Sequence, residues 1–113
     1  MPAFKAARVV RGFAEDLIKE GATWAAGLGH LLRAAAYAWT DAASAARVEL
    51  LAAEEQLVSS GMMGLLHVAR LRRGRIEGGA VGNARAAAAR DFLSDLGAID
   101  PDAMAWHLLP WPN

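Results

Sequence analysis

The segment from Thr23 to Trp39 constrains the fold more than any other stretch of this chain. Its sequence is TWAAGLGHLLRAAAYAW, and Arg33 is its single charged residue. An apolar stripe at helical spacing runs through Trp24, Leu28, Leu31, Ala35 and Trp39. A helix with so little polar surface is buried on most sides. We therefore expect the central helix of a bundle, in which both tryptophans supply the bulk that alanine lacks.

Helical patterns flank this segment on both sides. Residues 2–20 repeat apolar side chains at helical spacing, and Gly21 is suited to end that helix. Residues 40–73 read as one long helix, with Thr40 or Asp41 placed to cap it. The glycines and serines of Ser59–Gly64 weaken it by about 1 kcal/mol for each glycine. One apolar face continues through that weak point, so we expect a continuous helix.

The C-terminal third contains the clearest signals for turns and helix ends. The glycine content of residues 74–82 predicts a loop, after which Asn83 is placed to cap a helix that Gly97 ends. Asp100 and Pro101 suit the start of a short closing helix, and residues 110–113 form an extended tail. The prediction is one all-α domain over residues 1–113. We expect a compact bundle of about four helices with a long third helix.

The content of small apolar residues and the balance of charges indicate which kinds of partner this chain can bind. Hydrophobic residues make up 55% of the sequence, but many are alanines, which bury little area. A thin core of this kind favours an oligomer or a protein partner. Twelve basic residues balance twelve acidic ones, so no overall field attracts nucleic acid or an anionic membrane.

Compartment and redox chemistry follow from what the sequence lacks. There is no cysteine, which excludes disulfides and thiolate chemistry. Lys5, Arg8 and Arg11 interrupt the apolar stretch that a signal peptide needs. The longest uncharged runs fall short of the roughly 20 residues of a membrane span. We expect a soluble, cytoplasmic protein.

No pattern in the sequence indicates catalysis. None of the three histidines has a carboxylate or another histidine three or four residues away, as helical metal sites require. Glu54 and Glu55 are adjacent and diverge around a helix, so they read as a solvated acidic face. The glycines of residues 74–82 lack the lysine and hydroxyl of a phosphate loop. We expect no catalytic residue, no metal and no cofactor.

Four arginines lie close together at the end of the long predicted helix. Arg70 and Arg73 are one turn apart and share a face, Arg72 points elsewhere, and Arg75 falls in the predicted loop. Cations at a helix C-terminus interact favourably with the helix dipole. The cluster could also bind phosphates, although no aromatic residue is interleaved with it. We interpret it first as a charged contact patch for a partner.

The C-terminal sequence MAWHLLPWPN supplies candidate apolar anchors, Trp106, Leu109 and Trp111. Rigid aromatic side chains of this kind are enriched at interfaces. The segment either folds back to close the bundle or docks into another chain.

The leading hypothesis is a non-enzymatic interaction or assembly module that works by helix packing. A small bacterial or phage regulator, inhibitor or structural subunit fits, with a protein partner or further copies of itself. The first alternative is a nucleic-acid-binding protein that uses the Arg70–Arg75 cluster. The second is a peripheral membrane protein that inserts the Thr23–Trp39 helix or the tryptophan tail.

Overall fold

The computed structural model describes residues 3–112, with side chains from residue 5 onward, and within that range it has six helices and no strand. They are α1 (Ala3–Lys19), α2 (Thr23–Ala38), α3 (Ala43–Ser60), α4 (Met63–Glu77), α5 (Gly79–Asp95) and α6 (Pro101–Leu108). The all-α prediction is confirmed. The prediction of about four helices is wrong, because the expected long third helix is divided at Gly61 into α3 and α4.

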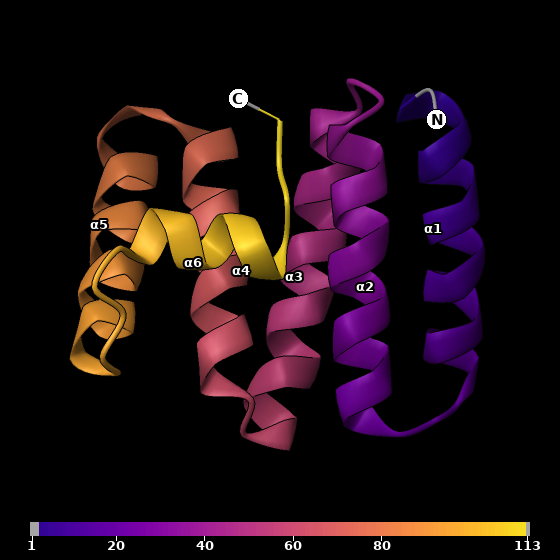
Figure 1. Ribbon diagram of the computed structural model, residues 1–113, viewed down its shortest axis with the longest axis horizontal. Coiled ribbons are helices and arrows are strands. Elements are labelled where there is room, and N and C mark those ends of the chain that lie inside the picture. Colours follow the sequence, from indigo (N-terminus) through magenta and orange to yellow (C-terminus); the bar gives the residue numbers. More distant parts are fainter. Residues whose placement is uncertain (1–2, 113) are drawn as a thin grey trace.

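The helices are arranged as a row that follows the chain. Figure 1 shows α1 to α5 running alternately down and up, each beside the next, with the short α6 lying across α4 and α5. Each of the first five helices packs on its neighbour in sequence, and α6 contacts both α4 and α5. Helix α2 contacts α1 on one side and α3 on the other, so it is covered by two neighbours, but it is the second helix of the row rather than the central helix predicted.

The predicted continuous helix over residues 40–73 is wrong. Gly61 ends α3 with a φ of 72°, in the left-handed region that glycine adopts readily. Its N–H donates to the Val58 carbonyl, and the Met62 N–H donates to the Leu57 carbonyl. These two bonds form a Schellman motif, which satisfies the last carbonyls of α3. The chain therefore reverses, and α4 packs back on α3.

The predicted glycine-rich loop over residues 74–82 is also wrong. Arg75 lies in α4, Asn83 lies inside α5 rather than at its cap, and Gly78 alone separates the two helices. A Cβ on Gly74 would lie 2.6 Å from the Gly82 carbonyl oxygen. These glycines thus allow two helix backbones to touch, because a larger residue would hold them apart.

The core is built from leucine and alanine. The largest fully buried side chains are Leu31, Leu50, Leu57, Leu66, Leu71, Leu93 and Val68. Trp24 and Trp39, expected in the core, are instead 53% and 41% exposed. Both stand at the ends of α2, where no neighbouring helix covers them fully. The expected caps of α3, Thr40 and Asp41, lie before its N-cap residue Ala42.

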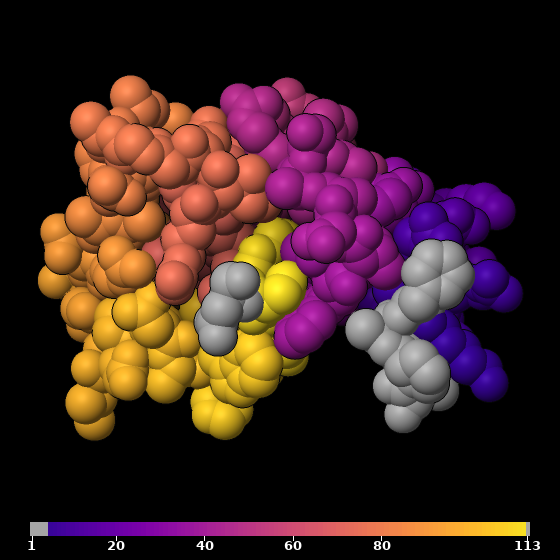
Figure 2. Space-filling view, turned by 90° about the horizontal axis from the view of Figure 1, so that it is seen from above, coloured from indigo at the N-terminus to yellow at the C-terminus, as the bar shows by residue number. Residues whose placement is uncertain are grey.

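The C-terminal segment folds back on the bundle. The Asp100 carboxylate accepts a hydrogen bond from the Ala103 N–H, and Pro101 begins α6, as predicted. Leu109 and Trp111 are 3% and 7% exposed and belong to the main core cluster. Figure 2 shows this yellow segment lying between the parts of the surface coloured as α4 and as α2–α3. The last residue of the predicted tail, 113, lies outside the described residues.

Candidate functional site

The four clustered arginines divide into two groups because α4 presents two faces to different neighbours. Arg70 and Arg73 bond to Glu54 on α3, so the prediction that they share a face is confirmed. Arg72 points elsewhere, as predicted, and its Nη2 donates to the Leu109 carbonyl of the C-terminal segment. Arg75 is exposed on the side of Arg72 and lines the same pocket.

The first group centres on a buried salt bridge between α3 and α4. Arg73 donates from Nε and Nη2 to the two Glu54 carboxylate oxygens, at 2.5 and 2.8 Å. Arg70 adds a weaker contact from Nε to Glu54 Oε1, at 3.4 Å. Glu54 and Arg73 are each only 7% exposed. This fork-to-fork geometry fixes the position of one helix on the other.

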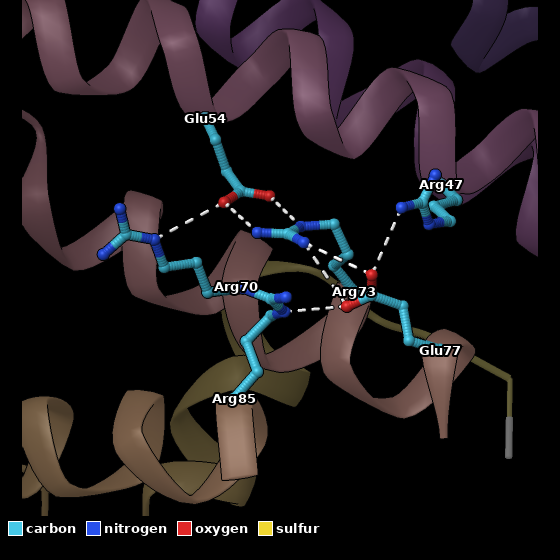
Figure 3. Close-up of polar contacts among 6 residues, drawn as sticks. All are labelled: Arg47, Glu54, Arg70, Arg73, Glu77 and Arg85. Atoms are coloured by element: carbon cyan, nitrogen blue, oxygen red, sulfur yellow. Dashed lines mark hydrogen bonds and ion pairs between the residues drawn. The ribbon is translucent and has the colours of Figure 1, made fainter. Parts of the chain in front are cut away.

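Glu77 extends the network to a third helix. Its carboxylate accepts from Arg73 at 3.3 Å, from Arg47 of α3 at 3.3 Å and from Arg85 of α5 at 2.7 Å. Figure 3 shows the four arginines converging on the two glutamates from α3, α4 and α5. The network therefore joins three consecutive helices and retains an excess of positive charge.

The charges in this network stabilise one another. Hydrogen bonds that Arg73 donates to Glu54 raise the pKa of Arg73, and they outweigh the opposing effect of burial. Burial acts to raise the pKa of Glu77, but hydrogen bonds from Arg85 and Arg47 and the charge of Arg73 hold it below its ordinary value. Both groups are therefore ionised at neutral pH.

Glu54 is the network residue whose position differs from the sequence prediction. The sequence predicts a solvated face for Glu54 and Glu55, yet Glu54 is buried and Glu55 alone is exposed. The feature of the sequence that could have placed Glu54 in the network is the turn at Gly61. A hairpin closing there brings residues shortly before it beside residues shortly after it, and Glu54 and Arg70 stand on either side at similar separations.

The second group lines a pocket between α4, α6 and the C-terminal segment. Its volume is about 340 Å³. Its walls are Arg72, Arg75, Asp100, Asp102, Ala103, Trp106, Trp111 and Pro112. Four of the seven residues singled out in the sequence therefore meet here, and a fifth, Leu109, accepts a hydrogen bond from Arg72 through its carbonyl oxygen.

Arg72 has an unusual environment for a buried cation. It is 6% exposed, and Nη2 donates to the Leu109 carbonyl at 3.0 Å. Its guanidinium lies 5.8 Å from the centre of the Trp111 ring. Its Nε is buried without a hydrogen-bond partner among the described residues. Burial, reinforced by the charge of Arg75, lowers the pKa of Arg72 to about 10.

A further surface of interest is the outer face of α3. Val48, Leu51 and Val58 are 61%, 37% and 52% exposed. The opposite side of the same helix contributes Ala46, Leu50, Ala53 and Leu57 to the core, all at 0% exposure. Helix α3 is thus apolar on two sides, and only one of them is covered by the residues that the structure describes.

A metal site is not found at the salt-bridge network, in the pocket or on the outer face of α3 among the described residues. Among the residues the structure describes, no three His, Cys, Asp or Glu side chains are grouped to hold a metal ion. No helix in that range is long and apolar enough to cross a membrane. Comparison with protein-family models, curated proteins and solved structures gave no match to this chain.

Proposed function

We propose that this protein is a non-enzymatic interaction module that assembles with a second copy of itself through the outer face of α3. The observation that carries the proposal is the spacing on that face. Its exposed positions include Ser44, Val48, Leu51, Glu55 and Val58, which alternate steps of four and three residues. Alternating steps of this kind form the seam of two packed helices.

Charges beside the seam favour a second copy as the occupant. Two α3 helices that cross antiparallel at Leu51 place residues four positions before it beside residues four positions after it. Arg47 of one copy then faces Glu55 of the other, and the pairing occurs twice because a two-fold interface repeats each contact. The same crossing brings Val58 beside Ser44, a small residue that permits close approach.

The expected interface is small. A single helix pair buries less than the roughly 800 Å² per partner of a standard stable interface. Assembly should therefore depend on protein concentration, with a dissociation constant on the order of micromolar. The thin alanine-rich core of the single chain is consistent with additional burial on assembly.

The nucleic-acid alternative has less support. The excess of arginine over glutamate around Glu54 and Glu77 favours an anion there. However, Arg73 is buried in its salt bridge and Arg72 is buried under Trp111. Phosphate contacts through these two residues would require both arrangements to open. For the membrane alternative, either α2 would have to leave its place between α1 and α3 or the tail would have to withdraw Trp111 from the core.

The test is the mass in solution by light scattering over a concentration series, with ultraviolet absorbance for bound nucleic acid. We expect a monomer–dimer equilibrium without nucleic acid. Leu51→Asp should abolish the dimer, whereas Val81→Asp, on the exposed side of α5, should not. Glu55→Arg should weaken the dimer, because it places an arginine opposite Arg47 of the other copy. A monomer at every concentration would contradict the proposal.

A further inference from the structure

We propose that the pocket between α4, α6 and the C-terminal segment binds a small aromatic carboxylate, held by Arg72 and Arg75 and contacted by the rings of Trp106 and Trp111. This site is separate from the outer face of α3, so either proposal can fail without the other.

The first argument is that the buried charge of Arg72 has no ion-pair partner and is only partly offset by Asp102. Buried charges in proteins are normally paired, because an isolated one loses its hydration without compensation. Arg73, the other buried arginine, has Glu54 and Glu77 as ion-pair partners. Arg72 forms no salt bridge within the described residues and has a carbonyl and an aromatic ring beside it. The charge of Asp102 acts on it from the pocket wall without an ion-pair contact. A ligand carboxylate in the adjoining pocket would supply the missing negative charge.

The second argument concerns the two acidic residues of the pocket. Asp100 uses its carboxylate to cap α6, accepting from the Ala103 N–H at 3.1 Å. Asp102 pairs with Arg90 at 3.2 Å. Both carboxylates therefore have other partners, whereas Arg75 adds a second, exposed guanidinium beside Arg72. The pocket favours an anion.

The third argument is the apolar part of the walls. Trp106 and Trp111 present indole rings, one half-exposed and one buried. Flat aromatic walls suit a flat aromatic ligand, and guanidinium forks suit a carboxylate. The volume of about 340 Å³ lies at the lower end of the range for small-molecule sites. A single-ring or indole acid matches this combination.

Isothermal titration with sodium benzoate, and with benzamide as the neutral analogue of the same shape, tests the proposal on the unaltered protein. We expect benzoate to bind and benzamide to bind about tenfold to a hundredfold more weakly, as the loss of a charged hydrogen bond implies. Inorganic phosphate should bind more weakly than benzoate, since it makes no use of the rings. Equal binding of benzoate and benzamide, or no benzoate binding at about 1 mM, overturns the proposal.

Variants locate the site. Arg72→Met should weaken benzoate binding by about tenfold or more, and Trp106→Leu, at a half-exposed position, should weaken it without loss of fold. Arg70→Met is the matched control, because it removes the same charge from the same helix on the face that contacts Glu54. If Arg72→Met does not fold, the proposal is tested by Trp106→Leu and by the comparison of benzoate with benzamide. Unchanged affinity in Trp106→Leu places the ligand elsewhere.

Discussion

Arg73 and Glu54 are joined by two hydrogen bonds, at 2.5 and 2.8 Å, across the interface between α4 and α3. Both side chains are almost completely removed from water. Their desolvation is compensated only while both partners remain. This pair therefore matters less as a source of net stability than as a constraint on how the two helices dock.

Removal of Arg73 should destabilise the fold strongly. Arg73→Met leaves the buried Glu54 carboxylate with its weaker contact to Arg70, and we expect a loss of about 3–5 kcal/mol in the free energy of unfolding. Urea denaturation measures it. The double variant Glu54→Leu/Arg73→Met should recover much of that loss, because no buried charge is left alone. Arg70→Met, at a part-exposed position, should cost about 0–1 kcal/mol.

Two glycine-to-alanine substitutions should have opposite effects. At Gly74 the added methyl group would meet the backbone of α5, so α4 and α5 must separate, at a cost of about 1–3 kcal/mol. At Gly12, inside α1, a Cβ would meet nothing within 4 Å. There the gain in helix propensity should stabilise the protein by about 0.5–1 kcal/mol. Thermal unfolding of both variants measures the two effects. Equal changes in Tm would contradict a close contact between the α4 and α5 backbones at Gly74.

The sequence predicted those features that depend on local chemistry. The start of α6 follows from the side chain of Asp100 and the ring of Pro101, which act within one turn. The divergence of Arg72 from Arg73 follows from helical geometry alone. Four of the pocket-lining residues were singled out in advance, although nothing in their spacing showed that they meet.

The features that were missed depend on neighbours distant in sequence. A glycine such as Gly74 looks the same in a loop and in a helix-to-helix contact, and only the approach of α5 distinguishes them. The sequence around Gly61 predicts a continuous helix, because a periodic apolar face continues on both sides of this glycine. That face persists because α3 and α4 bury it against the same core, not because the helix is continuous. The burial of Glu54 follows from that one turn.

His67 should make the fold sensitive to mild acid. It stacks on Phe92 with 3.7 Å between ring centres, and Nδ1 is buried without a partner among the described residues. Burial, helped by the charge of Arg70 and opposed by Glu54, lowers the pKa of His67 below 6.5. The unfolded chain therefore binds the proton more readily, and stability present above pH 6.5 is lost as pH falls through the folded-state pKa.

Urea denaturation at a series of pH values measures this effect. His67→Phe keeps the stacked ring and removes the titrating group, so its free energy of unfolding should fall less on acidification than that of the parent. The difference between the two proteins isolates His67 from the carboxylates, which titrate at lower pH. Parallel curves would show that the ring is already accommodated in its protonated form.

The C-terminal segment should contribute to stability through Trp111 far more than through Trp106. Trp111 is 7% exposed in the core cluster, whereas Trp106 is 48% exposed. Trp111→Ala removes a large buried side chain and leaves a cavity beside Arg72, and we expect a loss of about 3–5 kcal/mol. Trp106→Ala should cost no more than about 1 kcal/mol. Chemical denaturation followed by far-ultraviolet circular dichroism measures both, independently of tryptophan fluorescence. Equal effects of the two substitutions would mean that the segment does not close the bundle in solution, and that Leu109 and Trp111 are free to serve as anchors for another chain.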